Sequence, residues 1–177
     1  MSRRHGQVSI RPARPPSEGS ADLGTVAAIF GHYVEHTVAT FTETPPTVAE
    51  WADRHAELIS AGLPFLVADT GEAVVGFAYA APWRSKAAYR YTVEDTVYLD
   101  PAATGRGLGT SLLSQLLTQA AASGYRQMIA VIADTGDPAS VNLHRRLGFA
   151  NAGRLTAVGF KHDRWVDTLL MQREVGP

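Results

Sequence analysis

The sequence has 177 residues, a formal net charge of -1 at pH 7 and no cysteine. That length suits one domain with a sizeable core, and the near-neutral charge argues against a nucleic-acid partner, which normally requires a basic excess. The lack of cysteine excludes disulfides, thiolate metal sites and cysteine nucleophiles, and no apolar run approaches the roughly 18 residues of a membrane span. We therefore expect a cytoplasmic protein that engages neither nucleic acid nor membrane.

The first half of the chain predicts two helices followed by a hairpin. A capping box formed by Thr47 and Glu50 marks the start of the second helix, and Gly62 marks its end. We interpret residues 1–7 as a disordered lead-in to one domain that spans 8–177. The expected elements are a strand at 8–11, a helix at 21–36 capped by Ser20, a helix from 47 to about 61, and strands at 65–68 and 73–81.

The first helix carries a candidate metal motif. His32, Glu35 and His36 match the His-x-x-Glu-His pattern of inverted zinc peptidases, and histidines four apart share a helix face. A catalytic zinc needs a third protein ligand, and five-residue patterns arise easily by chance. We therefore favour histidines that line or flank a cleft and predict no metal, with a zinc peptidase as an alternative.

The connection at 82–90 is basic and aromatic. It contains Arg84, Lys86, Tyr89 and Arg90, and it leads directly into the next strand. Such a loop can be a plain solvated connection, or it can hold an anionic small substrate, since binding residues concentrate on loops. The residues alone leave both interpretations open.

The central stretch at 92–123 is interpreted as a strand, a glycine turn and a helix. β-Branched and aromatic residues fill 92–99, and Asp100 and Pro101 end the strand. Gly105, Gly107 and Gly109 allow a tight turn, and the helix that follows points free N–H groups and the positive end of its dipole outward. The stretch is therefore a candidate phosphate or pyrophosphate site.

Three other interpretations of the glycine turn compete with that site. A nucleotide-hydrolase P-loop needs a lysine after its last glycine, and none follows Gly109. A dinucleotide fingerprint would need a glycine at Thr110 and an acidic residue about 20 positions later, whereas residues 124–126 offer no carboxylate. A glycine turn without a ligand stays open, because such turns are common between strands and helices.

The last third of the chain predicts a buried strand, a short helix and a second hairpin. Ser140 is expected to cap the helix and Gly148 to end it. Because strands and helices mix, with hairpins near both ends, we predict an α/β fold with one mixed, mostly antiparallel sheet flanked by helices. The expected elements are a strand at 128–133, a helix at 140–147, and strands at 154–160 and 168–173 joined by a turn at 161–164.

Two adjacent carboxylates lie in the central strand. Glu94 and Asp95 face opposite sides of a sheet, so only one of them is expected to reach a given cleft. A carboxylate there could take a proton from an attacking ammonium in acyl transfer, and a backbone N–H of the strand could polarise the carbonyl. His144 on the short helix could relay a proton or orient an amine, or it could be a packed histidine at the core edge.

The glycine turn reads Gly-Arg-Gly-Leu-Gly-Thr after a strand that ends in Val-Tyr-Leu. It resembles the acyl-coenzyme-A pyrophosphate loop of the GNAT acetyltransferases. The segments Tyr91-Thr-Val-Glu-Asp-Thr-Val-Tyr and Val158-Gly-Phe-Lys-His-Asp-Arg-Trp-Val-Asp more specifically resemble the phosphinothricin N-acetyltransferase branch, and the likeness runs from Val8 to Arg173. The resemblance implies a GNAT-type fold, acetyl-CoA as co-substrate and a homodimer.

The same resemblance implies roles for individual residues. Glu94 matches the general-base glutamate of that branch, and His144 matches its catalytic histidine. Thr104 stands where the loop has glutamine or arginine, Lys86 where an arginine is common, and Asp137 where an asparagine contacts pantetheine. The implied coenzyme contacts are Val97, Tyr98, Leu99, Thr104, Gly105, Arg106, Gly107, Leu108, Gly109, Thr110, Asp137 and Ser140, and the implied substrate contacts are Phe41, Arg84, Lys86, Tyr89 and Val131.

The expected activity is acetyl-CoA-dependent acetylation of the α-amine of a small amino-acid-like substrate, by direct attack in a ternary complex. Phosphinothricin, methionine sulfoximine and methionine sulfone are the candidate substrates. An acetyltransferase for another amine (an antibiotic, a polyamine or a protein N-terminus) is an alternative, although the cationic loop at 84–90 disfavours polycations. A non-catalytic acyl-coenzyme-A-binding module is another, suggested by Thr104 and Asp137.

Overall fold

The computed structural model describes residues 8–176, and their strands form one seven-stranded sheet. The expected disordered lead-in at 1–7 lies outside these residues. The strands are β1 (Ser9–Pro12), β2 (Phe65–Asp69), β3 (Val74–Pro82), β4 (Thr92–Leu99), β5 (Gln127–Ala133), β6 (Ala150–Lys161) and β7 (Arg164–Glu174). The α-helices are α1 (Asp22–His36), α2 (Val48–Ser60), α3 (Leu108–Ala122) and α4 (Ala139–Arg146), and the short 3-10 helices are η1 (Pro16–Glu18), η2 (Ala87–Tyr89) and η3 (Pro101–Ala103).

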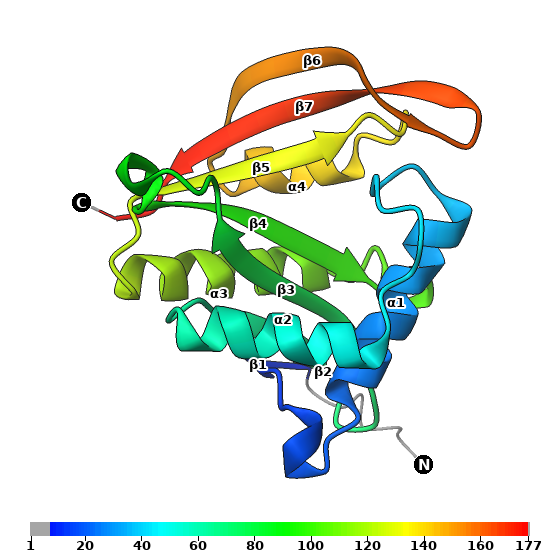
Figure 1. Cartoon of the computed structure of the whole chain (residues 1–177), viewed down its shortest axis with the longest axis vertical. Coiled ribbons are helices and arrows are strands. Elements are labelled where there is room, and N and C mark those ends of the chain that lie inside the picture. The colour runs from blue at the N-terminus through cyan, green and yellow to red at the C-terminus, as the bar shows by residue number, and fades with distance from the viewer. Residues whose placement is uncertain (1–7, 177) are drawn as a thin grey trace.

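The strand order across the sheet is β1-β2-β3-β4-β5-β7-β6 (Figure 1). Neighbouring strands are antiparallel except for β4 and β5, which run parallel. This arrangement confirms the predicted mixed, mostly antiparallel sheet. None of the helices within residues 8–176 combines the length and the apolar character that crossing a membrane requires.

Helices cover both faces of the first half of the sheet. Gly76 and Phe77 are neighbours on β3 and therefore point to opposite faces. The Phe77 ring lies 5.5 Å from the Trp51 ring of α2, whereas a Cβ on Gly76 would lie 3.3 Å from Leu112 of α3. We call the two sides the α2 face, which α1 also covers, and the α3 face; the core fills the space between the helices and the sheet (Figure 1).

A local signal places the start of α2 as predicted, whereas α1 begins at Asp22, one residue later than predicted, with Ala21 and not Ser20 as its N-cap. Thr47 and Glu50 form the capping box, in which each side chain accepts the backbone N–H of the other residue. Ser20 precedes the N-cap of α1, and its hydroxyl accepts the N–H of Asp22, the first residue of the helix, at 3.1 Å. These bonds satisfy N–H groups that a helix start leaves without partners.

The prediction that Ser140 caps α4 is wrong. The helix already begins at Ala139, and Asp137 Oδ1 accepts the N–H of Ala139 at 2.9 Å. A capping side chain must precede the first free N–H groups, and Ser140 stands two residues after the N-cap, Pro138. The Ser140 carbonyl instead accepts a bond from a side chain further along α4, described below.

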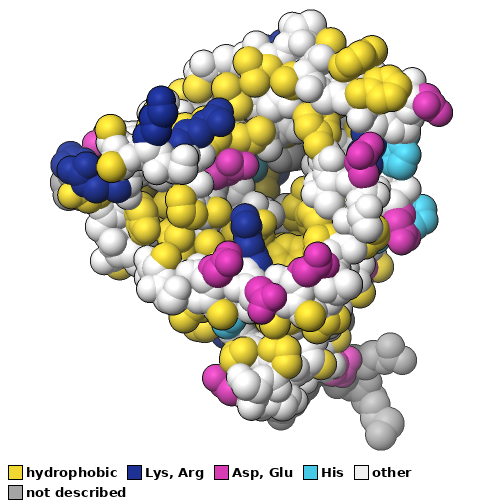
Figure 2. All heavy atoms as spheres, viewed as in Figure 1, with side chains coloured by type: hydrophobic (Ala, Val, Ile, Leu, Met, Phe, Trp, Pro, Cys, Tyr) yellow, Lys and Arg dark blue, Asp and Glu magenta, His cyan; other side chains and the backbone are white. Residues whose placement is uncertain are grey.

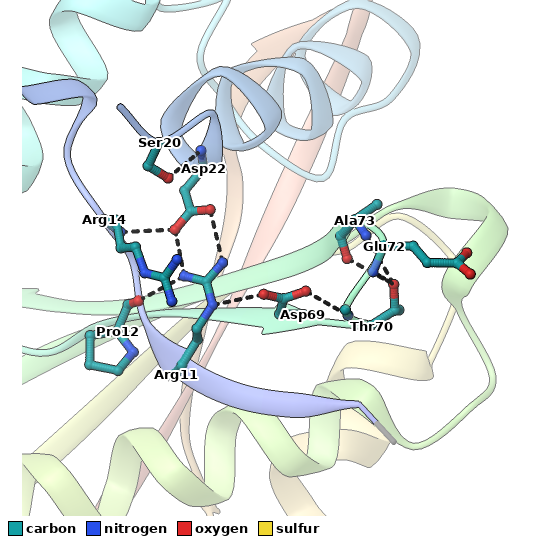
Figure 3. Close-up of polar contacts among 10 residues, drawn as sticks. Arg11, Pro12, Arg14, Ser20, Asp22, Asp69, Thr70, Glu72 and Ala73 are labelled. Carbon is teal, nitrogen blue, oxygen red and sulfur yellow. Dashed lines mark hydrogen bonds and ion pairs between the residues drawn. The ribbon is translucent and has the colours of Figure 1, made fainter. Parts of the chain in front are cut away.

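An ion cluster fastens the N-terminal edge of the sheet (Figure 3). Arg11 of β1 donates to both carboxylate oxygens of Asp22, at 2.6 and 3.0 Å, and to Asp69 Oδ2 at 2.8 Å. The Arg14 N–H adds a bond to Asp22, and the Gly71 N–H adds one to Asp69. We call these residues the Arg11 cluster; it ties β1 to the start of α1 and to the β2–β3 turn.

The Arg11 cluster favours the charged form of both carboxyls. Its hydrogen bond from Arg11 is the main reason that the pKa of Asp22 lies below its usual value. The pKa of Asp69 is also lowered, first by the Gly71 N–H and then by Arg11. Each carboxylate therefore contributes stability only while it is ionised.

The C-terminal hairpin is longer than predicted. Strand β6 begins at Ala150 and β7 at Arg164, and the turn between them places His162 and Asp163 at φ 49 and 55°. The register of β6 shifts twice against β7, between Asn151 and Gly153 and again further along the strand. Such bulges interrupt the alternation of inward and outward residues, so the sequence pattern underestimates the length of the strand.

Candidate active site

Strands β4 and β5 part from each other within the sheet. They pair only over Thr92–Glu94 and Gln127–Ile129, although β4 continues to Leu99 and β5 to Ala133. Figure 1 shows the two strands diverging beyond their paired ends. Residues 95–99 therefore border a gap, which we call the β4–β5 gap, and within residues 8–176 no strand pairs with that edge of their backbone.

The glycine turn follows β4 and leads into α3. Gly105 and Gly107 have φ 74 and 78°, which favour glycine, and a Cβ on either would meet nothing within 4 Å. Gly107 is the N-cap of α3, and no described side chain caps this helix. The first N–H groups, from Leu108, Gly109 and Thr110, have no acceptor within the helix, so they and the helix dipole form a candidate anion site.

The other residues of the turn stabilise its shape or its packing. Thr104 Oγ1 donates to the Pro101 carbonyl at 3.0 Å, and Arg106 Nη2 donates to another η3 carbonyl at 3.2 Å. Gly109 lies inside α3, where a Cβ would be 3.3 Å from Leu143 of α4. The third glycine therefore allows the close approach of two helices, whereas the first two shape the turn.

The far end of β4 also anchors the segment after α1. Tyr33 donates to the Leu99 carbonyl at 2.8 Å, and Tyr98 donates to the Ala39 carbonyl at 3.3 Å. Burial raises the pKa of Tyr98, so its phenol stays protonated. Val97 packs half-buried against the core. The three residues predicted to contact coenzyme here thus lie along the β4–β5 gap. The Leu99 carbonyl also holds α1, and the Tyr98 side chain holds the segment that follows α1.

Glu94 lies on the α2 face, at the last paired position before the gap. Its register neighbour on β5 is Ile129, and no hydrogen bond from the described residues acts on its carboxylate. Burial and the charge of Asp95 raise the pKa of Glu94, while Arg84 and Arg54 oppose that rise. A half-buried carboxylate with a raised pKa and free oxygens is suited to accept a proton.

His144 forms a buried pair with Asp95 on the α3 face. The two residues are 4% and 8% exposed, and His144 Nε2 lies 2.9 Å from Asp95 Oδ2. His144 Nδ1 lies 2.7 Å from the Ser140 carbonyl oxygen, and the Phe149 ring packs edge-on against the imidazole at 5.0 Å. Burial lowers the pKa of His144, but the bonds to Asp95 and Ser140 outweigh burial, so the pKa is raised.

The two predicted catalytic residues therefore lie on opposite faces of the sheet. Glu94 and Asp95 alternate along β4 as predicted, and it is Asp95 that meets His144. The β4–β5 gap runs between the two sides. Any reaction that uses both residues has to take place at the gap, because only there is the sheet open between its two faces.

The apolar substrate residues predicted from the resemblance lie on the α2 face or close to it. Phe41, Tyr89 and Val131 have 40, 44 and 40% of their surface exposed. Val131 is two residues beyond Ile129 on β5, so it points to the same face as Glu94. These side chains are accessible to a ligand on the side of the sheet where Glu94 lies.

The cationic residues of the β3–β4 connection lie at the rim of the same face. The Arg84 guanidinium stacks over Trp83 at 4.7 Å from the ring centroid, and Lys86 precedes η2. Figure 2 shows this side of the molecule hollowed in its middle, with Lys and Arg side chains at the rim formed by the connection and acidic side chains along α2. A small anionic group would meet positive charge at this rim.

Three further residues at the site had no clear signal in the sequence. Arg54 of α2 contributes positive charge near Glu94. Lys161 of β6 is 4% exposed and donates from Nζ to the Thr40 carbonyl at 2.9 Å. A Cβ on Gly159 would lie 2.4 Å from the Phe41 ring, which therefore rests on this glycine. Lys161 and Thr40 are 121 residues apart, too far for any local pattern to link them.

The His32–Glu35–His36 motif does not form a metal-binding group. The two imidazoles stack at 4.8 Å, and His36 Nδ1 donates to the His32 carbonyl at 3.0 Å. Residues 8–176 contain no group of three histidine, aspartate or glutamate side chains placed to hold a metal ion. The motif therefore lacks the third ligand that a catalytic zinc requires.

Comparison with known proteins places this geometry in a family. Residues 28–149 match the model of the Acetyltransferase (GNAT) family. The chain is 45% identical over 152 residues to the phosphinothricin N-acetyltransferase of Alcaligenes faecalis, covering 86% of this chain and 77% of that protein. It is 40% identical over 174 residues to the L-methionine sulfoximine/L-methionine sulfone acetyltransferase of Pseudomonas paraeruginosa, covering 96% of each.

A solved structure shares the same fold. The crystal structure of a GNAT superfamily phosphinothricin acetyltransferase from Sinorhizobium meliloti, in complex with AcCoA, matches with a TM-score of 0.88 and 46% sequence identity. The match covers 96% of this chain and 89% of that one. The protein therefore belongs to the GNAT acetyltransferase family and is an N-acetyltransferase of its phosphinothricin N-acetyltransferase-like branch.

Proposed function

We propose that the protein transfers an acetyl group from acetyl-CoA to the α-amine of a small amino-acid-like substrate, of the phosphinothricin or methionine sulfoximine and sulfone type. The observation that carries this proposal is Glu94, a half-buried carboxylate with a raised pKa on the open α2 face at the start of the β4–β5 gap. The activities named for the relatives from Alcaligenes faecalis and Pseudomonas paraeruginosa support the substrate class.

The residues around the gap fit acetyl-CoA. The open turn at Gly105 and Gly107, with the uncapped amides at the start of α3, suits a diphosphate. The backbone of Val97, Tyr98 and Leu99 along the gap suits the amides of a pantetheine arm. When bound, acetyl-CoA supplies the thioester whose acetyl group is transferred.

Glu94 acts as the general base. An α-ammonium must lose a proton before its nitrogen can attack the thioester carbonyl, and Glu94 takes that proton directly or through one water. The new C–N bond forms as the C–S bond breaks, and the sulfur leaves as a thiolate that is then protonated. Burial raises the pKa of Glu94 and so makes the carboxylate a better acceptor near neutral pH.

The rim of the α2 face binds the rest of the substrate. Arg84 and Lys86 pair with the acidic groups of an amino-acid analogue, and Tyr89 lies in the same connection. Phe41 and Val131 offer exposed apolar surface to its side chain. Because Lys86 is a point charge without the fork of arginine, it tolerates several acid geometries better than it selects one.

A substrate panel tests this function. Purified protein is given acetyl-CoA with phosphinothricin, methionine sulfoximine, methionine sulfone, a polyamine and an aminoglycoside, and release of free thiol is followed. We expect turnover with the amino-acid analogues and none with the polycations, which the cationic rim repels. Turnover only with another amine would overturn the substrate class, and calorimetric binding of acetyl-CoA with no turnover at all would indicate a non-catalytic module.

We also propose that the protein works as a homodimer, with the C-terminal hairpin as the contact. Exposed apolar side chains gather there, and a contiguous exposed apolar patch marks an interaction surface. Light scattering after gel filtration should give twice the 19.0 kDa chain mass, and Trp165→Ser should shift the protein toward monomer. A wild-type monomer at micromolar concentration would refute the dimer. The exposed fractions are 45% for Leu155, 52% for Val158, 52% for Phe160 and 67% for Trp165.

A further inference from the structure

The His144 imidazole has an acceptor at each ring nitrogen. Nδ1 lies 2.7 Å from the Ser140 carbonyl oxygen, which can only accept, so Nδ1 carries a proton. Nε2 lies 2.9 Å from Asp95 Oδ2. One proton must lie between Nε2 and that oxygen, because two bare lone pairs would repel each other at this distance.

Two arrangements of that proton satisfy the geometry. Either His144 is an imidazolium that donates to the Asp95 carboxylate, or a neutral His144 accepts from a protonated Asp95. An imidazole ordinarily binds a proton far more tightly than a carboxylate does, with pKa values of about 6.5 and 3.9. The Ser140 carbonyl strengthens the cation further by accepting its second N–H.

We infer that Asp95 is a positioning residue that holds His144 as an imidazolium between β4 and α4, and thereby determines the protonation state in which His144 enters the reaction. Asp95 lies one residue beyond the last β4–β5 pair, where the gap begins. The pair thus fastens α4 to the edge of the gap and leaves a fixed cation beside it. This role builds on the acetyl transfer proposed above, but the state of the ring can be measured without it.

A fixed imidazolium decides between the two roles open to His144. With Nδ1 and Nε2 both bonded and 4% of the residue exposed, the ring can neither accept a proton from the amine nor release one of its own. It can only stabilise negative charge that develops at the gap. Glu94 is then the only base of the two, and His144 is the group whose charge favours departure of a thiolate.

Asp95 also links the two faces of the sheet. Its charge is one cause of the raised pKa of Glu94, after burial and against the opposing Arg84 and Arg54. It is the only charged side chain within residues 8–176 that shifts the pKa of His144. Loss of the Asp95 charge therefore lowers both pKa values at once, and this coupled change is a signature that a merely structural contact would not give.

One oxygen of Asp95 adds to this view. Asp95 Oδ1 is buried and has no hydrogen-bond partner among the described residues. Buried polar atoms are rarely left unbonded, and only one other side-chain atom within residues 8–176, Trp51 Nε1 in the core, shares this state. The bond to His144 is therefore the only hydrogen bond that the described residues give the Asp95 carboxylate.

The test measures the His144 ring directly. Two-bond ¹⁵N–¹H spectra of uniformly labelled protein report the protonation of both ring nitrogens, and the His144→Gln variant assigns the signal. We expect both nitrogens of His144 to stay protonated through pH 8 in the wild type. In Asp95→Asn, Nε2 should lose its proton near pH 6.5 or below, while Nδ1 keeps its own. Glu72→Gln, which removes an exposed charge in the β2–β3 turn, should leave His144 unchanged.

The pH profile gives a second, independent readout. Because activity requires ionised Glu94, kcat/KM rises with pH through its pKa, and Asp95→Asn should move that rise to lower pH. A neutral His144 in the wild type at pH 7 would overturn the inference, and so would a folded Asp95→Asn whose His144 still carries both protons at pH 8. If the variant does not fold, the wild-type spectrum alone still decides whether His144 is an imidazolium. Absence of turnover with every amine would refute the proposed function and leave the ring measurement valid.

Discussion

The molecule has two groups of buried or half-buried carboxylates, and they differ in how completely they are bonded. In the Arg11 cluster, Asp22 and Asp69 each have both oxygens engaged, by Arg11 and by backbone N–H groups. On β4, Asp95 leaves one oxygen unbonded within the described residues, and no hydrogen bond there supports the Glu94 carboxylate. The described residues supply hydrogen bonds to every carboxylate oxygen in the Arg11 cluster, but not to every one in Glu94 and Asp95.

We expect this difference to separate residues that stabilise the fold from residues that serve the proposed reaction. A buried ion that is fully bonded stays charged and ties elements together, as the lowered pKa of Asp22 shows. A buried carboxylate without bonds costs stability, and its pKa rises, as for Glu94. Such groups persist in folds mainly where a substrate or a reaction step completes them.

The largest expected effect comes from neutralising Glu94, the proposed base. Glu94→Gln should lower kcat by about 10²–10⁴-fold, the usual contribution of a general base. The melting temperature should not fall, because burial already disfavours the charge at this position. Thiol release and a thermal melt measure the two quantities, and turnover near wild type at every pH would remove Glu94 from its role.

The complete cluster should give the opposite result. Asp22→Asn leaves the Arg11 guanidinium without its main partner and should lower the free energy of unfolding by about 2–4 kcal/mol, given that Arg11 is partly exposed. Turnover of the folded variant should match the wild type. Urea unfolding measures the loss, and Glu18→Gln in the neighbouring exposed turn is the matched control. A change in kcat of more than about twofold would show that the Arg11 cluster also affects turnover, which contradicts this prediction.

Lys161, a buried cation whose ammonium group is hydrogen-bonded, lies at the edge of the site and extends the comparison to substrate binding. Lys161 holds the segment that carries Phe41, and the Phe41 ring rests on Gly159. Gly159→Ala must displace that ring, so we expect the KM for the amine to rise about 10-fold, the scale of one methyl group in an apolar pocket. The KM for acetyl-CoA should not change.

Gly24→Ala is the control for that change, because a Cβ there meets nothing within 4 Å. An equal rise in both KM values for Gly159→Ala would mean that the segment shapes the whole site and not the substrate side. No change in either value would show that Phe41 does not contact the amine.

The smallest effect is a difference in the pH dependence of stability. Asp22 has a lowered pKa, so its contribution is present above about pH 3.9 and is lost as the pH falls through its folded pKa. His144 has a raised pKa, so its contribution is present below about pH 6.5 and is lost as the pH rises through its folded pKa. In a plot of melting temperature against pH, the fall at low pH should therefore become smaller in Asp22→Asn. The fall at high pH should become smaller in Asp95→Asn.

Much of the fold follows from short-range signals. The Thr47–Glu50 capping box, the glycine turn and the strand at 92–99 all appear where predicted. Each depends on residues within one turn or one strand, whose backbone and side-chain bonds form locally. The cap of α4 and the full length of β6 were mispredicted, because α4 begins one residue before Ser140 and bulges hide the strand.

The sequence by itself determined the family resemblance, the mixed sheet, the alternation of Glu94 and Asp95 and the glycine turn before α3. Only the tertiary structure decided which carboxylate meets His144, where β4 and β5 separate, and what holds Phe41. Asp95 and His144 are 49 residues apart, and Lys161 and Thr40 are 121 apart. Local propensity acts over a few residues, whereas these contacts arise when packing brings distant segments together and burial makes their bonds obligatory.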